Sequence, residues 1–84
     1  MKKLYKFYKN DCSPCYAMAR NLLQLHLADT MDIVELNVND ETNKELAKEN
    51  GIDKVPALML ENGNTLIGLK NKDEIMAFVN EKNL

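Results

Sequence analysis

The sequence predicts an α/β fold in which the elements run β-α-β-α-β-β-α and build one four-stranded mixed sheet with helices on both faces. Three observations carry this prediction. Short runs rich in aliphatic and aromatic residues alternate with longer stretches whose apolar residues recur at helical spacing. Asn62-Gly63 separates the last two apolar runs, which is a strong hairpin signal. The first strand–helix–strand unit should be parallel and right-handed, as such units nearly always are.

The size and charge of the chain limit what it can be. Its 84 residues are 45% hydrophobic and 29% charged, which is typical of one small globular domain, here residues 1–84. A net charge of −2 argues against a nucleic-acid-binding protein. No apolar stretch is long enough to span a membrane, and Lys6 and Lys9 interrupt the run that a secretory signal would need. We therefore expect a cytoplasmic monomer without nucleic-acid or membrane partners.

The first half of the predicted fold begins with a strand at Lys3–Tyr8, because aromatic residues suit extended backbone. A helix is expected from about Pro14 to Leu27, since proline is favoured in the first helical turn. The apolar stripe of this helix comprises Cys15, Met18, Ala19, Leu22, Leu23, Leu25 and Leu27. Residues 31–38 are predicted to form the second strand, with side chains alternating between two faces.

A polar second helix is predicted over residues 39–51. Asn39 or Asp40 can cap its start and Gly51 ends it. Its few core contacts are Leu46 and Ala47, so it covers one face of the sheet thinly.

The last part of the chain is predicted to form a hairpin and a helix. The third strand covers residues 54–60, and its continuously apolar end is typical of a central strand. Residues 65–69 are its antiparallel partner. A final helix over residues 71–84 begins at Asn71, which can form a capping box with Glu74.

Both cysteines lie in the motif Cys12-Ser13-Pro14-Cys15. In a cytosolic chain such a pair is more often catalytic or metal-binding than structural. Cys12 is expected at the N-cap of the first helix, where free backbone N–H groups and the helix dipole lower the pKa of its thiol. Cys15 is expected to be more buried and close enough to attack a mixed disulfide at Cys12. Cys12 is therefore the predicted attacking thiol and Cys15 the resolving thiol.

A metal site is the main alternative for this cysteine pair. A self-contained zinc site needs four ligands, and His26 is the one further soft donor, more simply explained as a surface or capping histidine. Copper chaperones also place a CxxC motif between a strand and a helix. Their order β-α-β-β-α-β lacks the helix predicted here between the second and third strands. We expect no bound metal, and an adaptor with an idle dithiol ranks lower still.

The element order, the Cys-Ser-Pro-Cys motif after the first strand and Val55-Pro56 before the third strand together resemble the thioredoxin/glutaredoxin superfamily across the chain. The resemblance implies a minimal thioredoxin fold and a dithiol–disulfide oxidoreductase. Its only redox centre would be the Cys12–Cys15 disulfide, supported by Ser13 and Pro14. It also implies a cis-proline at Pro56 against the dithiol, with Val55 offering backbone groups to a substrate strand.

The motifs resemble two branches of the superfamily. Pro14 before Cys15 resembles thioredoxins, whereas the short length and Lys9 resemble glutaredoxins, in which a lysine helps to bind glutathione. Glutaredoxins continue after the last strand with Gly-Gly and a nearby Asp, but here Gly68 is followed by Leu69. We therefore expect a thioredoxin-like reductant of protein disulfides, re-reduced by a thioredoxin-reductase-type flavoprotein. A glutathione-dependent glutaredoxin is the alternative.

Two positions depart from the thioredoxin pattern. Asp11 stands before the first cysteine, where thioredoxins carry Trp, and Lys6 stands where they carry a buried acid. Asp11 is either a solvated loop residue or a selector of partners by charge, together with Lys9, Lys54 and Lys70 around the dithiol. In either case its carboxylate opposes the helix dipole and raises the pKa of the Cys12 thiol.

Overall fold

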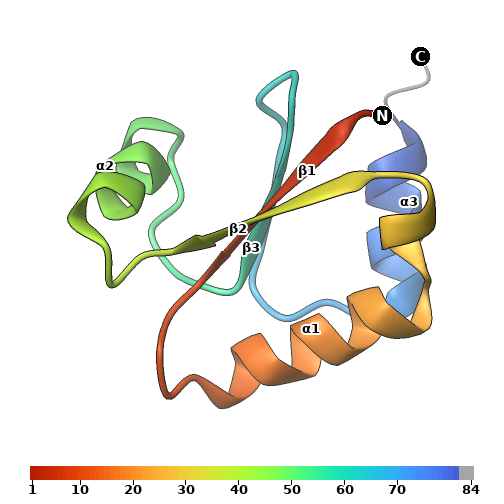
Figure 1. Cartoon of the computed structure of the whole chain (residues 1–84), viewed down its shortest axis with the longest axis horizontal. Coiled ribbons are helices and arrows are strands. Elements are labelled where there is room, and N and C mark those ends of the chain that lie inside the picture. Colours follow the sequence, from red (N-terminus) through yellow and green to blue (C-terminus); the bar gives the residue numbers. More distant parts are fainter. Residues whose placement is uncertain (82–84) are drawn as a thin grey trace.

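The order of elements is the predicted one, with one short 3₁₀ helix added after the first α-helix. The computed structural model describes residues 1–81, so the predicted helical residues 82–84 lie outside the described residues. The strands are β1 (Lys3–Tyr8), β2 (Asp32–Asn37), β3 (Ala57–Leu60) and β4 (Thr65–Ile67). The helices are α1 (Ser13–Gln24), η1 (Leu27–Asp29), α2 (Glu41–Glu49) and α3 (Lys72–Glu81). Figure 1 shows α2 on one side of the sheet and α1 with α3 on the other.

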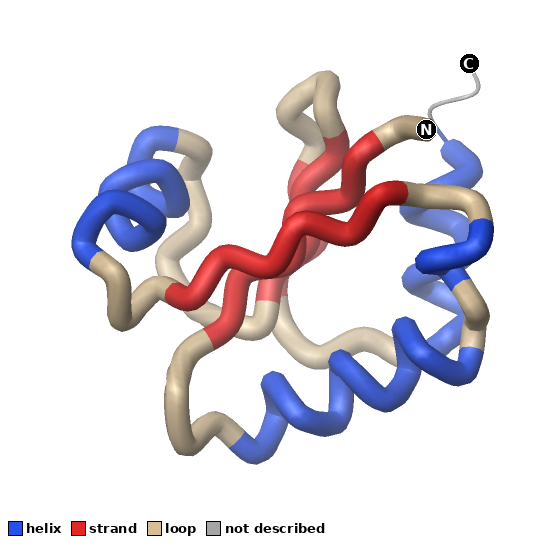
Figure 2. Tube along the Cα trace, in the orientation of Figure 1, coloured by secondary structure: helices blue, strands red, loops and turns tan. Residues whose placement is uncertain are grey.

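The strands form one four-stranded mixed sheet in the order β2-β1-β3-β4, drawn in red in Figure 2. β1 runs parallel to β2 and antiparallel to β3, with Phe7 opposite Ala57. β3 and β4 form the predicted antiparallel hairpin. The end of β1 and the start of β3 therefore lie at the same edge of the sheet, which positions the segments described below.

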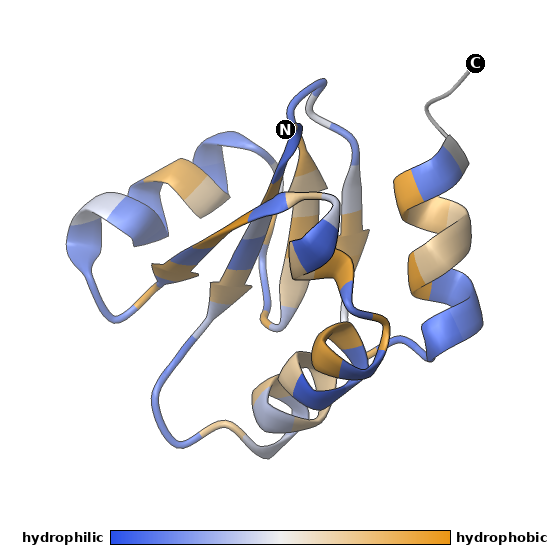
Figure 3. Ribbon diagram, turned by 45° about the vertical axis from the view of Figure 1, so that its right-hand side comes forward, coloured by the Kyte–Doolittle hydropathy of each residue, from blue (hydrophilic) through white to orange (hydrophobic). Residues whose placement is uncertain are grey.

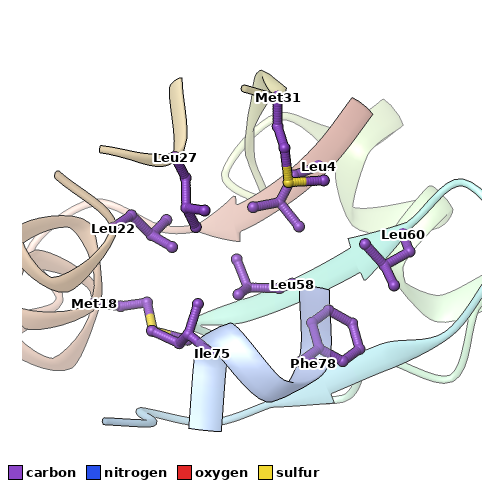
Figure 4. Packing of buried hydrophobic residues seen from close by; sticks show 9 residues of the cluster. All are labelled: Leu4, Met18, Leu22, Leu27, Met31, Leu58, Leu60, Ile75 and Phe78. Carbon is purple, nitrogen blue, oxygen red and sulfur yellow. The ribbon is translucent and has the colours of Figure 1, made fainter. Parts of the chain in front are cut away.

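Two apolar clusters hold the layers together, one on each face of the sheet. Figure 4 shows the larger cluster, in which side chains from β1, β3, α1 and α3 point toward one another. Its buried members are Leu4, Met18, Leu22, Leu27, Met31, Leu58, Leu60, Ile75 and Phe78. The smaller cluster lies under α2 and contains Phe7, Ala47, Ile52, Ala57 and Met59. In Figure 3, α2 is mostly hydrophilic with one short apolar stretch, as expected of a thin cover.

The predicted helix caps of α2 and α3 are confirmed. The Asp40 carboxylate accepts a hydrogen bond of 2.9 Å from the backbone N–H of Thr42. At the start of α3, Asn71 and Glu74 each accept a hydrogen bond from the other's backbone N–H, at 2.8 and 3.0 Å. These bonds satisfy backbone donors that the first turn of a helix leaves without partners.

The first helix ends one turn earlier than predicted. α1 stops at Gln24, and His26 then adopts a left-handed conformation with φ of 55° before η1 begins. Leu27 reaches the core from this separate turn. The prediction that Leu23 belongs to the apolar stripe is wrong, because its side chain is 75% exposed. Leu22 is buried, and a step of one residue turns the next side chain away from the sheet.

The bounds of β3 and β4 are also narrower than predicted. β3 begins at Ala57, because Pro56 has no N–H to donate to a strand ladder. β4 ends at Ile67, since Gly68 has a φ of +96° that strands do not use. The pairing nevertheless extends one bond further, with the Gly68 N–H donating to the Pro56 carbonyl at 2.8 Å.

Lys6 lies in the central strand β1. Its side chain is only 12% exposed, and Nζ lies 3.4 Å from a carboxylate oxygen of Glu35, the residue opposite it in β2. Nζ also lies 5.4 Å from the centre of the Tyr8 ring. A largely buried cation therefore occupies the position at which thioredoxins carry an acid, and an acid from the neighbouring strand neutralises it.

Exchanging these two charges tests whether the pair stabilises the sheet. Lys6→Glu places two carboxylates opposite each other on paired strands and should lower the free energy of unfolding by about 1–3 kcal/mol. The double variant Lys6→Glu/Glu35→Lys restores opposite charges and should recover most of that loss. Urea unfolding of the wild type, both single variants and the double variant measures this. A double variant no more stable than Lys6→Glu would show that the pairing does not matter.

Candidate active site

The two motifs singled out in the sequence meet at one edge of the sheet. β1 ends at Tyr8 and leads through a short loop to α1, which begins directly after Cys12 (Figure 1). The pairing of Phe7 with Ala57 places the start of β3 beside the end of β1. Val55 and Pro56 come immediately before that start, so topology brings them to the edge at which the cysteine loop begins.

Cys12 is the N-cap residue of α1, as predicted. Its backbone is extended, with φ of −123°, and its Sγ atom accepts a hydrogen bond of 3.2 Å from the backbone N–H of Cys15. A disulfide joins Cys12 to Cys15, with the two Cα atoms 5.2 Å apart. Ser13 and Pro14 are the first two residues of the helix and are exposed. The sulfur of Cys12 therefore lies at the positive end of the helix dipole, where a thiolate is stabilised.

The predicted difference in burial between the two cysteines is wrong in this disulfide-bonded structure. Cys12 is 4% exposed and Cys15 is 5% exposed. The disulfide holds Cys12 against the first turn of α1, so both residues are covered alike. What distinguishes them is electrostatic, because Cys12 Sγ accepts a backbone N–H at the helix start whereas Cys15 lies within the helix.

The peptide bond between Val55 and Pro56 is cis, as the family resemblance implied. Pro56 is buried and Val55 half-buried. The Lys54 side chain lies beside Gly68, because a Cβ atom added to Gly68 would be in van der Waals contact with Lys54 Cε at 3.9 Å. Lys54, Val55 and Gly68 therefore lie together beside the hydrogen bond between Pro56 and Gly68.

Of the charged residues proposed to select partners around the dithiol, some line a common cavity and others do not. Lys9 and Lys54 line the same open cavity of about 550 Å³, together with Val55. Lys70 is not among the described residues that line it, and its backbone carbonyl accepts a hydrogen bond from the Asn21 side chain at 2.9 Å. Asp11 is exposed and left-handed, with φ of 53°.

Three charged residues of this cavity were not predicted from the sequence. Lys44, Lys48 and Asp53 also line it. A signal was present for the two lysines, because they are four residues apart and therefore share one face of the predicted helix. Their proximity to Lys9 depends on the fold.

Replacing Asp11 by Asn isolates the effect of its charge. Asn tolerates the left-handed conformation as well as Asp does, so the loop should be unchanged. Removing the carboxylate beside Cys12 should favour the thiolate and speed its alkylation at neutral pH by about threefold. The reduced proteins are compared by their rates of reaction with iodoacetamide. Asp29→Asn, at the end of η1, is the matched control, and equal rates in both variants would contradict this effect.

Within residues 1–81, no group of three or more His, Cys, Asp or Glu side chains is arranged to hold a metal ion. His26 is exposed and is the N-cap residue of η1. None of the helices in that range has the length and apolar character needed to cross a membrane.

Comparisons with known proteins agree with this geometry. A family model described as Thioredoxin matches residues 2–81. Thioredoxin f2 of Chlamydomonas reinhardtii has 28% identity and a TM-score of 0.75, with 96% of this chain and 78% of that chain covered. Mitochondrial thioredoxin 3 of Saccharomyces cerevisiae, in its oxidized form, has 25% identity and a TM-score of 0.76, with 95% and 77% covered. The search of curated proteins found no match.

The family and the cysteine pair together support thiol–disulfide oxidoreductase chemistry. The matched family model spans nearly all of the described residues, including Cys12, Cys15 and the cis peptide bond before Pro56. The four-stranded sheet in the order β2-β1-β3-β4, with three α-helices, is the minimal form of the fold of these neighbours. The chain therefore belongs to the thioredoxin family.

Proposed function

We propose that this protein is a thioredoxin-like reductant of protein disulfides, in which Cys12 attacks the substrate and Cys15 resolves the intermediate. The observation that carries the proposal is the position of Cys12 at the N-cap of α1, with Sγ accepting the Cys15 N–H while bonded to Cys15 Sγ. An anionic sulfur gains most from that position, and the partner needed to close the cycle is already within bonding distance.

The proposed reaction transfers two electrons from the dithiol to the substrate. The Cys12 thiolate attacks one substrate sulfur, a Cys12–substrate disulfide forms, and the other substrate sulfur leaves as a thiolate. Cys15 then loses its proton and attacks Cys12 Sγ, which releases the second substrate thiolate. The products are the oxidised pair Cys12–Cys15, as in this structure, and a substrate with two reduced thiols.

Val55 and Gly68 are the proposed contacts for the substrate chain next to its disulfide. Both lie at the edge of the sheet where the cysteine loop begins, on either side of the buried Pro56. An extended segment can pair with backbone groups there as a short additional strand. We propose that the protein acts in this way as a cytosolic monomer.

The proposed electron donor is a flavoprotein of the thioredoxin-reductase type. Leu69, 48% exposed, follows Gly68, so an apolar side chain occupies the place of the second glycine of a glutaredoxin clamp. Glutathione is the second candidate donor, and a specific observation favours it. Lys9 lines the same cavity as Val55. Its ammonium group is therefore placed to bind a carboxylate of glutathione next to the proposed substrate contacts.

The choice of donor tests the proposed function directly. The oxidised protein is given NADPH with thioredoxin reductase, or NADPH with glutathione and glutathione reductase, and insulin disulfides serve as the substrate. We expect the first system to support insulin reduction at least about tenfold faster than the second. Faster turnover with glutathione would establish the glutaredoxin alternative. Failure of both systems, and of dithiothreitol-reduced protein, would contradict the reductase function.

A further inference from the structure

The cavity beside Val55 carries a concentration of positive charge that the reductase chemistry does not require. We call it the basic groove and define it by Lys9, Lys44, Lys48, Lys54, Ile52 and Val55, which line it. Its volume is about 550 Å³, and Asp53 is the one carboxylate among the described residues that line it. The four lysines outnumber that carboxylate, so the groove is cationic above an apolar floor.

The positive charge of the groove contrasts with the net negative charge of the whole protein. The whole chain is acidic, with 13 acidic and 11 basic residues. α2 itself contains three glutamates, Glu41, Glu45 and Glu49, none of which is among the described residues lining the groove. Its lysines Lys44 and Lys48 do line it, and their spacing of one helical turn places both on the same face. Helix α2 therefore carries both acidic and basic residues, but among its charged residues only the lysines line the groove.

The groove continues directly from the active site. Val55 belongs to both, because it precedes the cis-proline and also lines the groove. Lys9 follows β1 on the loop that leads to Cys12. A substrate chain that reacts at Cys12 and extends past Val55 would therefore reach the lysines of α2.

We propose that the basic groove binds an acidic segment of the protein substrate, close in sequence to the substrate cysteine that Cys12 attacks. This inference rests on the proposed reductase function. Ammonium groups attract carboxylates without demanding one fixed geometry, which suits partners with differing sequences. Complementary charge of this kind mainly raises the rate of association and makes that rate depend on salt.

A protein segment fits the groove better than a small carboxylate ligand does. The lysines come from three separate parts of the chain: the loop after β1, the helix α2 and the loop before β3. Glutathione offers two carboxylates and one ammonium group, so it cannot neutralise four separated cations. A segment with several Asp or Glu side chains over an apolar floor can do so.

The test uses two synthetic disulfide peptides that differ only beside the reacting cysteine. One carries Glu-Asp-Glu and the other Gln-Asn-Gln at the same positions. The second-order rate constants of the pre-reduced protein with each peptide are measured by stopped flow at low and high salt. The wild type should reduce the acidic peptide about tenfold faster at low salt, and this preference should disappear at high salt.

The variant Lys44→Gln/Lys48→Gln should reduce that preference to about twofold, because Lys9 and Lys54 remain beside Asp53. Lys44 and Lys48 are exposed, so the fold should be unaffected. Lys2→Gln/Lys3→Gln removes the same charge from exposed residues at the start of β1 and should keep the preference.

Three outcomes overturn the inference. Equal rates of the wild type with both peptides would refute the groove while leaving the reductase function intact. An equal loss in the Lys2/Lys3 control would show only a general charge effect. The Lys44→Gln/Lys48→Gln variant is also tested with oxidised glutathione as substrate. A rate constant that falls as much with glutathione as with the acidic peptide would identify a small-ligand site. If neither peptide is reduced at all, the failure lies in the proposed function itself.

Discussion

Cys12→Ser is expected to reduce the rate of disulfide reduction by about a thousandfold or more, to the uncatalysed background. A serine hydroxyl at the N-cap of α1 can still accept the Cys15 N–H, so the start of the helix should be kept. It cannot replace the thiolate, because a hydroxyl is a far weaker nucleophile toward sulfur. The measurement is insulin reduction with dithiothreitol as donor.

The matched reference for this variant is the reduced wild type, because both proteins lack the disulfide. Their urea unfolding curves should agree within about 1 kcal/mol, which shows that the lost activity is chemical rather than a loss of fold. Undiminished activity of Cys12→Ser would remove Cys12 from the mechanism.

Leu58→Ala is expected to cost about 2–5 kcal/mol of unfolding free energy. Leu58 lies in the central strand β3, is 0% exposed and points into the cluster in Figure 4. Domains of this kind have total stabilities of about 5–15 kcal/mol, so this single truncation removes a large fraction. Urea unfolding followed by circular dichroism measures the effect.

Leu23→Ala is the control for that loss, because the chemical change is identical and the side chain is 75% exposed. Its unfolding free energy should stay within about 0.5 kcal/mol of the wild type. Similar losses in both variants would mean that the core is not where the structure places it.

Much of the fold could be predicted because its signals are local. The capping box of Asn71 and Glu74 needs only neighbouring residues, and the hairpin at Asn62-Gly63 needs only its own turn. The burial of individual helix residues was harder, as Leu23 shows. The predicted stripe included both Leu22 and Leu23, but adjacent residues of a helix point about 100° apart, and of these two α1 buries only Leu22.

In the candidate site, too, the features set by neighbouring residues could be predicted, whereas those set by distant contacts could not. The N-cap position of Cys12 follows from the strand before it and the proline after it, so the sequence indicated it correctly. The pairing of Lys6 with Glu35 depends on the register between two strands, and one sequence alone does not reveal that register. The equal burial of the two cysteines depends on their disulfide, which the prediction from helix position ignored.

The central claim is that the pair is directional, with Cys12 attacking and Cys15 resolving. The most direct measurement compares reduced Cys15→Ser and reduced Cys12→Ser, each mixed with the same disulfide substrate and followed by intact mass. We predict that Cys15→Ser accumulates a stable mixed disulfide with the substrate, because no resolving thiol remains, while Cys12→Ser forms little or none. Accumulation of the adduct on Cys12→Ser at an equal or greater rate would contradict the assignment.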